Sequence, residues 1–185
     1  MIEENKNKKL KNQRRPRKKR DFSEKINHKV VQIKRVSKVV KGGKKMSFRA
    51  VVVVGIDGRT GFVGIGTGKA DDVTNAINKA VAKGKRNLIN IPITKTETIP
   101  HSVTGVFGAS NVIIRPSAPG SGVIAGSSIR TVLEVAGIRN VLAKQLGSSN
   151  LLNNAKATIN GLNQLKTISQ VAQERDIAVD LLYQN

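Results

Sequence analysis

The sequence contains no cysteine and no tryptophan, and only five of its 185 residues are aromatic. Without cysteine the chain cannot form a disulfide, offer a thiol nucleophile or build a cysteine-based zinc site. Domains that bind single-stranded RNA by stacking the bases need aromatic side chains interleaved with basic ones. The aromatic residues are too sparse for that class of binder. They are Phe22, Phe48, Phe62, Phe107 and Tyr183.

Acidic residues are also few. The chain has 12 Asp and Glu against 33 Lys and Arg, a formal net charge of +21, and residues 1–49 hold 19 of the basic but only 4 of the acidic side chains. Such concentrated charge predicts a polyanionic partner, either nucleic acid or an anionic membrane surface. A membrane-surface protein needs a helix with large apolar residues opposite its charge, which is not present, so we expect no membrane partner. DNA stays an alternative to RNA, although no helix-turn-helix or zinc signature is visible.

The N-terminal segment is almost entirely polar and basic, with ten Lys and Arg between Lys6 and Arg20. It lacks the apolar core of a secretory signal and the composition of a transit peptide, and no apolar run in the chain approaches the roughly 20 residues that span a bilayer. We predict a retained, disordered basic tail over residues 1–28 that orders only against a polyanion. Contact with RNA is preferred over a purely solubilising role.

Groups suited to catalysis are scarce. His28 lies beside the basic tail, His101 follows a proline in a loop, and no cluster of histidines and carboxylates has metal-ligand spacing. Most of the acids stand at predicted turns or helix ends, where capping explains them. The sequence therefore predicts that the protein is not an enzyme and that it has no catalytic residue, no metal and no cofactor.

The segment after the tail predicts a small antiparallel sheet. Residues 30–40, 48–56 and 62–67 are rich in valine and isoleucine, as strands are, and turn signals separate them. Gly42 and Gly43 interrupt a basic stretch and mark a hairpin tip. These patterns predict a three-stranded meander.

A helix is predicted next, from Val73 to Leu88, with Asp71 as its N-cap and Asp72 at its positive end. The order of three strands and a helix is also that of the main part of double-stranded RNA binding domains. One face of this helix is basic, through Lys79, Lys83 and Arg86.

The glycine-rich stretch "GFVGIGTGKA", residues 61–70, fits neither the dinucleotide fingerprint nor the phosphate loop, since glycines are missing at the required positions and Ala70 replaces the required hydroxyl. Instead Gly64, Gly66 and Gly68 alternate along one strand and leave one of its faces bare. Two readings are equally supported: close approach of another backbone or an RNA surface, or tight packing under the following helix.

We place a domain boundary in "NIPITKTETIP", residues 90–100, which reads as a short edge strand and loop. The second half predicts a strand at residues 111–115, a loop rich in Gly, Ser and Pro, and a helix capped by Ser127 and ended by Gly137. Further helices are predicted at residues 151–165 and from about Ser169. The fold class is therefore α+β.

Four long stretches resemble small-subunit ribosomal protein five of the bacterial and plastid type. They occur in the order of that family, and the resemblance covers residues 29–184. The stretches are "RVSKVVKGGKKMSFRAVVVVG" (residues 35–55), "GFVGIGTGKADDV" (61–73), "PSAPGSGVIAGSSIRTVLEVAGIRNVLAKQLGSSN" (116–150) and "NNAKATINGL" (153–162).

The resemblance implies an RNA-binding domain like that of double-stranded RNA binding proteins over residues 29–92. It also implies a C-terminal domain with a β-α-β core over residues 93–185. The family is a non-catalytic constituent of the small ribosomal subunit that binds small-subunit ribosomal RNA and takes part in subunit assembly. It touches ribosomal proteins four and eight, lies by the messenger entry path and influences translational accuracy. The C-terminal sequences look more plastid or cyanobacterial than enteric, so we expect a plastid ribosome in the stroma, with the bacterial cytoplasm as the alternative.

The resemblance also implies residue roles. The "VKGGK" loop matches the loop that approaches the neck helix of the ribosomal RNA and the spectinomycin site. Family members often have Arg at the position of Lys44, where lysine offers only a point charge. The residues expected at RNA are Arg35, Lys38, Lys41, Gly42, Gly43, Lys44, Lys45, Phe48, Arg49, Lys69, Lys83 and Arg86. Those expected at the interface with another ribosomal protein are Gly120, Ser121, Gly122 and Arg130, the last matching an arginine that faces protein four.

Overall fold

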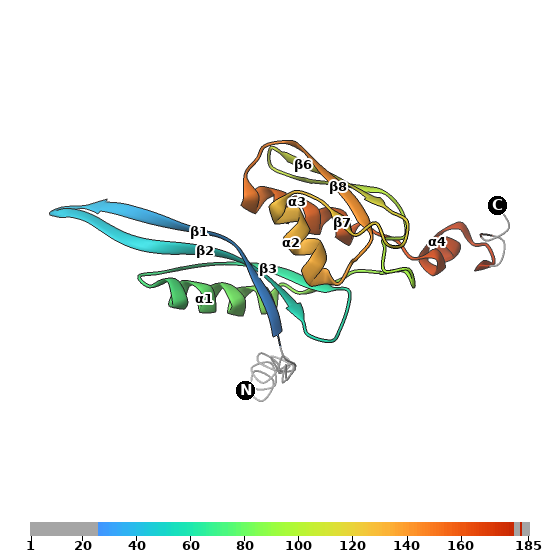
Figure 1. The fold of residues 1–185 in the computed structure, drawn as a ribbon, viewed down its shortest axis with the longest axis horizontal. Coiled ribbons are helices and arrows are strands. Elements are labelled where there is room, and N and C mark those ends of the chain that lie inside the picture. The colour runs from blue at the N-terminus through green and yellow to red at the C-terminus, as the bar shows by residue number, and fades with distance from the viewer. Residues whose placement is uncertain (1–25, 180–181, 183–185) are drawn as a thin grey trace, which may run out of the picture.

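The structure, a computed structural model, describes residues 26–179 and residue 182. Within these residues the chain forms two sheets and four helices (Figure 1). The elements are β1 (Ile26–Val40), β2 (Gly43–Ile56), β3 (Phe62–Ala70), α1 (Val73–Arg86), β4 (Ile89–Asn90), β5 (Val103–Phe107), β6 (Ser110–Pro116), β7 (Val123–Ile124), α2 (Ser127–Ala136), β8 (Val141–Gly147), α3 (Leu151–Asn163) and α4 (Ile168–Arg175). The strand orders are β1-β2-β3-β4 and β5-β6-β8-β7. The predicted α+β class is confirmed.

Strands β1 and β2 form a long antiparallel hairpin. Its register runs from Ile26 opposite Ile56 to Val40 opposite Gly43. At the tip Gly42 has φ of 94° and Gly43 has φ of 145°, a region that L side chains rarely adopt. The predicted interruption of the basic stretch by a hairpin tip is confirmed.

The predicted tail overlaps this hairpin. Strand β1 begins at Ile26, so the last three residues that the sequence assigns to the tail pair with β2 instead, and His28 lies opposite Val54. Ile26 is half-buried against the apolar cluster that holds Val54, which explains why pairing begins there. The rest of the predicted tail, residues 1–25, lies outside the described residues.

Helix α1 packs directly on the glycines of β3. A Cβ atom at Gly64 would lie 2.6 Å from the carbonyl oxygen of Gly84, and one at Gly66 would collide with the carbonyl oxygen of Ala80. Gly68 meets the same helix one turn earlier. The packing interpretation of the glycine stripe is confirmed, and the alternative of an RNA surface is wrong because helix backbone covers this face.

The ends of α1 differ from the prediction. Its N-cap is Asp72, which forms no capping hydrogen bond through its side chain. Asp71, the predicted cap, accepts a hydrogen bond from Ser47 Oγ at 3.2 Å and so ties the helix start to β2. The helix ends at Arg86, and Leu88 lies outside it, just before β4.

The second half contains the β-α-β unit that the resemblance implies. Strands β7 and β8 are parallel, and α2 connects them. The N-cap of α2 is Gly126, and the predicted cap, Ser127, is instead the first helical residue, whose carbonyl oxygen accepts a hydrogen bond from Thr131 Oγ1. Gly137 ends the helix with φ of 82°, as predicted.

The predicted strand at residues 111–115 is present as β6, but its neighbours β5 and β8 were missed. The valine pattern of β5 is interrupted by Gly105, whose missing side chain lets the backbone of α3 approach. Strand β8 begins with three apolar residues, Val141 to Ala143, and continues with the polar pair Lys144 and Gln145, so its sequence lacks the alternation that marks a half-exposed strand. Both pair with β6 and complete the sheet on either side of it.

The elements stack in layers, with α1 on one face of the first sheet and α2 and α3 between the two sheets (Figure 1). One apolar cluster joins both halves of the chain. It includes Val53 and Val63 from the first sheet, Ile129 and Leu133 from α2, and Ile114 from β6, all almost fully buried. The two sheets therefore share one core, to which the base of the hairpin is attached through Val53.

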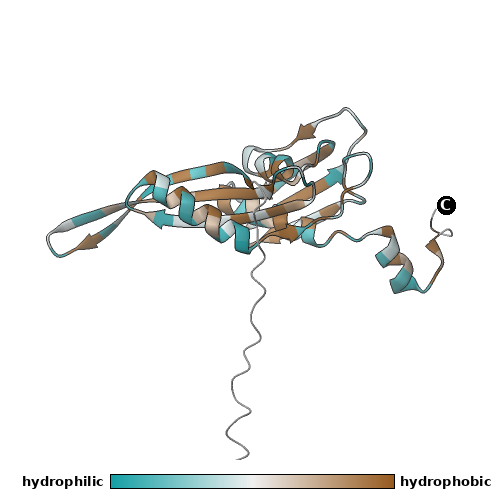
Figure 2. Ribbon diagram, turned by 90° about the horizontal axis from the view of Figure 1, so that it is seen from below, coloured by the Kyte–Doolittle hydropathy of each residue, from teal (hydrophilic) through white to brown (hydrophobic). Residues whose placement is uncertain are grey.

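Many residues of the strands in the body of the molecule are apolar, whereas the far end of the hairpin carries both polar and apolar residues (Figure 2). In the described part of the chain no helix combines the length and hydropathy needed to cross a membrane.

Candidate nucleic-acid interface

The far part of the hairpin, residues 33–48, is named the arm here. It extends past α1 and past the second half of the chain (Figure 1). Nearly all of its residues are exposed; Val39 keeps 73% of its surface accessible and Met46 keeps 43%. The arm contributes little to the core, so its conformation rests on β1–β2 pairing and on the glycine tip.

The arm carries basic charge without acidic charge. The sequence has no Asp or Glu from residue 25 to residue 56. None of the basic side chains in this interval beyond Lys29 forms an ion pair with a described residue. The arm therefore presents uncompensated positive charge, which a polyanion can neutralise. These residues are Lys34, Arg35, Lys38, Lys41, Lys44 and Lys45 in the arm, and Arg49 directly after it.

The register assigns these side chains to two faces. Residues of β2 that contact α1, such as Ala50 and Val52, alternate with Val51 and Val53, which face the second half of the chain. We call these sides the α1 face and the α2 face. Because directly opposed residues share a face, the predicted RNA residues divide between them. Arg35, Lys44 and Phe48 lie on the α1 face, and Lys38, Lys45, Arg49 and Lys69 lie on the α2 face, with Lys41, Gly42 and Gly43 at the tip.

The basic residues of α1 form a separate surface. Lys79, Lys83 and Arg86 are exposed on the helix that covers the α1 face. Lys83 and Arg86 also lie in the last helical turn, where positive charge is favoured by the helix dipole. The structure thus gives these two predicted RNA residues a stabilising role within the helix and leaves their charges accessible.

The described phenylalanines are half-buried in the protein. Phe48 packs against the cluster beneath α1, and Phe107 lies under Lys156, whose Nζ is 4.5 Å from the ring centroid. Phe62 is also half-buried. These rings are engaged in packing, so the described surface does not offer the row of aromatic platforms on which unpaired bases stack.

The predicted protein-interface loop is held by one buried side chain that sequence reasoning missed. Asn140 Oδ1 accepts a hydrogen bond from the Gly120 amide at 3.0 Å, and Asn140 Nδ2 donates to the Thr96 carbonyl oxygen at 2.9 Å. Thr98 Oγ1 donates to the Asn140 carbonyl oxygen at 2.5 Å. Gly120 and Gly122 have φ of 87° and 73°. Asn140 therefore fixes the path of a loop whose own residues are exposed.

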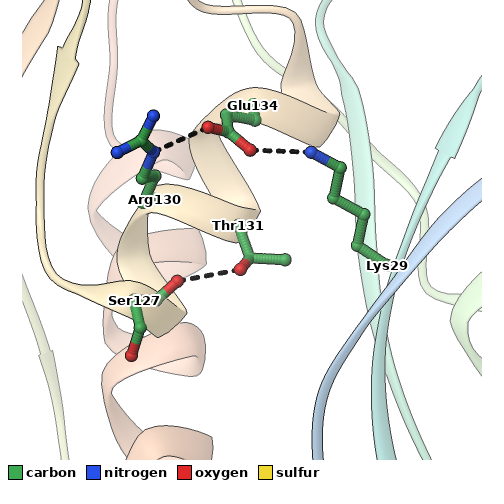
Figure 3. A network of polar contacts seen from close by, with 5 residues as sticks. All are labelled: Lys29, Ser127, Arg130, Thr131 and Glu134. Carbon is green, nitrogen blue, oxygen red and sulfur yellow. Dashed lines mark hydrogen bonds and ion pairs between the residues drawn. The ribbon is translucent and has the colours of Figure 1, made fainter.

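Arg130, the fourth predicted interface residue, is engaged within the chain. Its Nε donates to Glu134 Oε1 at 2.7 Å, one helical turn away, and Glu134 Oε2 accepts from Lys29 Nζ at 2.7 Å (Figure 3). The shared carboxylate joins α2 to the base of β1. Arg130 remains 58% exposed, and its guanidinium has further donors for a partner.

The same carboxylate predicts a small pH dependence. The hydrogen bond from Arg130, followed by that from Lys29, lowers the pKa of Glu134 below its ordinary value of 4.5. A lowered folded pKa stabilises the protein above the unfolded pKa, and this gain is lost as pH falls through the folded value. Glu134→Gln should cost about 0.5 kcal/mol at pH 7, because exposed ion pairs are worth little, and the cost should shrink as the pH falls below 4.5. Urea unfolding of both proteins over a series of pH values measures this, and a difference in unfolding free energy that does not shrink with falling pH contradicts it.

The two histidines belong to different parts of the fold. His28 lies in β1, and His101 Nε2 accepts a hydrogen bond from the Lys166 amide at 3.1 Å. Among the described residues no three of His, Asp and Glu gather closely enough to hold a metal ion. The predicted lack of cofactors, metals and catalysis stays a prediction.

A second exposed surface covers the outer face of the second sheet. A shallow groove of about 360 Å³ lies there, with cations at its sides and no carboxylate in its lining. Leu142 and Leu146 are both more than two fifths exposed. An exposed apolar patch of this kind is typical of contact with another macromolecule. The groove is lined by Ile113, Arg115, Ile124, Leu142, Ala143, Lys144 and Leu146.

Comparisons with known proteins agree with this architecture. The family model described as Ribosomal protein S5, N-terminal domain, matches residues 26–92, and that described as Ribosomal protein S5, C-terminal domain, matches residues 105–175.

Similar proteins come from cyanobacteria and from a plastid-type group. Small ribosomal subunit protein uS5 of Trichormus variabilis is 62% identical over 154 residues, which cover 83% of this chain and 87% of the relative. The uS5 protein of Thermosynechococcus vestitus is 60% identical over 173 residues, 94% of this chain and 96% of the relative. Protein uS5c of Trieres chinensis is 65% identical over 148 residues, 80% of this chain and 79% of the relative. The chain therefore belongs to the family of small ribosomal subunit protein uS5.

Proposed function

We propose that this protein is a structural constituent of the small ribosomal subunit and binds small-subunit ribosomal RNA through the arm. The observation that carries the proposal is the long hairpin without acidic residues, whose basic side chains after Lys29 form no ion pair with a described residue. Lysine and arginine side chains that neutralise phosphates release counterions, which supplies much of the affinity for RNA. The family membership agrees with this role.

Folded RNA fits the arm better than unpaired RNA. The rings of Phe48, Phe62 and Phe107 are half-buried, so base stacking is not the main source of affinity. Phosphates, 2′-hydroxyl groups and the shape of RNA helices remain as the features that a basic hairpin can contact. At the tip, nothing lies within 4 Å of the positions where side chains of Gly42 and Gly43 would begin, so the backbone itself can approach RNA.

The second half of the chain is proposed to contact other ribosomal proteins. The loop with Gly120, Ser121 and Gly122 is exposed but fixed by Asn140, and Arg130 lies exposed on α2. The apolar groove on the outer sheet face offers a further contact surface. These features support neighbours such as ribosomal proteins four and eight. A place beside the messenger entry path and an influence on assembly and accuracy are part of the same proposal, and no catalysis is assigned.

We divide the chain into an RNA-binding part at residues 29–92 and a protein-binding part at residues 93–185, connected by their common core. The plastid stroma is the proposed location, supported by similarity to the uS5c protein of Trieres chinensis. The similarity to cyanobacterial uS5 proteins keeps the bacterial cytoplasm as the second candidate.

Sedimentation tests the proposed function. A tagged full-length chain, expressed in a cyanobacterium, should sediment with small subunits and stay with them at moderate salt. A tagged protein of similar size and charge without ribosomal relatives serves as the control. Recovery of the chain wholly in the free soluble fraction would contradict the proposal.

A further inference from the structure

Three basic side chains lie side by side across the first sheet, at the base of the arm. Lys34 of β1 is directly opposite Arg49 of β2, and Arg49 is directly opposite Lys69 of β3. Directly opposed residues of antiparallel strands project from the same face, with Cβ atoms about 5 Å apart. The three residues therefore form one line across the strands, which we call the cation row. Sequence reasoning missed Lys34, because only the strand register shows that it completes this line.

The cation row is open to solvent on the α2 face. All three residues are exposed. Lys34 and Arg49, together with Val51, line a shallow pocket of about 80 Å³ that also borders Asn150 and Leu152 at the start of α3. The row thus lies beside the body of the molecule and is separate from the hairpin tip.

The charges of the row are not balanced within the described residues. Like charges directly opposite each other destabilise a sheet, yet none of the three side chains forms an ion pair there. The nearest carboxylate along the chain, Asp71, accepts its hydrogen bond from Ser47. Repulsion among these three cations therefore destabilises the protein when no partner is bound. A bound anion would remove that repulsion.

The spacing of the row fits a nucleic-acid strand. Adjacent strands of a sheet are about 4.8 Å apart, so the row spans about 10 Å. A nucleic-acid strand carries one negative charge per nucleotide, so three cations in line can each face one phosphate of a strand that runs along the row. A second opposed pair on the same face, Lys38 and Lys45, lies four residues farther out, about 13 Å away.

We propose that Lys34, Arg49 and Lys69 bind about three consecutive phosphates of one ribosomal RNA strand that crosses β1, β2 and β3. This contact is additional to the one at the hairpin tip. The inference rests on the proposed function and specifies where on the sheet, and in which direction, an RNA strand runs.

Salt-dependent RNA binding tests the cation row. The probe is small-subunit ribosomal RNA of Thermosynechococcus vestitus, transcribed in vitro, and the protein is the full chain. The row variant carries Lys34→Gln, Arg49→Gln and Lys69→Gln. The control variant, Lys95→Gln, Lys166→Gln and Arg175→Gln, removes the same charges from exposed positions outside the row, the arm and the apolar groove.

The row variant should lower the slope of log affinity against log salt concentration by about 2 to 3, since each phosphate contact contributes about 0.7 to 0.9. The control variant should keep the wild-type slope. Ethylation of RNA phosphates should identify about three consecutive positions that weaken binding of the wild type but not of the row variant. The row variant should melt no lower than the wild type, because repulsion between like charges is removed.

An unchanged slope in the row variant, or an equal decrease in the control variant, would overturn the inference. If RNA binding keeps its slope while the row variant no longer enters reconstituted subunits, the row faces a protein and the inference is also overturned. A wild-type protein that shows no salt-dependent RNA binding would instead contradict the proposed function itself.

Discussion

Replacing Gly66 by valine is expected to lower the free energy of unfolding by about 3 kcal/mol, the upper end of the usual cost of overpacking. A Cβ atom at Gly66 would collide with the Ala80 carbonyl oxygen and lie 2.6 Å from the Gly84 amide nitrogen. Both are backbone atoms of α1, so relief requires the helix to move away from β3. The higher strand propensity of valine offsets at most about 1 kcal/mol.

Thermal unfolding measures this effect. For a chain of this length the melting temperature should fall by about 10 °C, since each kcal/mol shifts it by about 2 to 4 °C. Thr67→Val is the matched control, because Thr67 is the next residue of β3 and is half-buried on the opposite face; it should change stability by less than about 1 kcal/mol. If Gly66→Val and Thr67→Val have equal melting temperatures, the close contact between α1 and β3 is not what requires glycine.

The strands and helices with strong local patterns could be predicted from the sequence. The valines of β2, the apolar spacing of α1 and the C-terminal glycine of α2 each determine their element locally. Strands β5 and β8 could not be predicted, because contacts with residues distant in the chain explain their sequences. Gly105 interrupts β5 because the backbone of α3 packs against it, and the exposed apolar residues of β8 form part of the outer sheet face.

The glycine stripe shows the same limit. Alternating glycines indicate a bare strand face, but only the position of α1 shows what occupies it. The helix caps were misplaced by one residue because Asp71 and Asp72, like Gly126 and Ser127, are adjacent candidates that local sequence does not separate.

The composition of the candidate site could be predicted from the sequence, but not which side of the sheet each of its residues faces. The absence of acidic residues from 25 to 56 is visible in the sequence, and it suffices to predict the arm as a basic surface. Strand register is needed to show that Arg35 and Arg49 project from opposite sides and that Lys34 aligns with Arg49 and Lys69. The side-chain hydrogen bonds of Asn140 are needed to show that it holds the glycine loop. These are long-range relations that only the fold establishes.

Neutralising the lysines at the hairpin tip is expected to weaken RNA binding without changing stability. Lys41, Lys44 and Lys45 are exposed and far from the core, so Lys41→Gln, Lys44→Gln and Lys45→Gln together should leave the melting temperature within about 1 °C, as surface changes usually do. The slope of log affinity against log salt should fall by about 2 to 3, corresponding to three lost phosphate contacts. Filter binding to small-subunit ribosomal RNA over a series of KCl concentrations measures the slope.

The tip and the cation row should act independently. Sites more than about 10 Å apart without shared partners usually contribute additively. The tip lysines lie at least four strand residues, about 13 Å, beyond Lys34 and Arg49. A protein with all six substitutions should therefore lose about 4 to 5 in slope, the combined effect of both sets. If the combined variant loses no more than the tip variant alone, the two sets neutralise the same phosphates, and the arm holds RNA at one place only. An unchanged slope in the tip variant would show that its lysines do not contact phosphate.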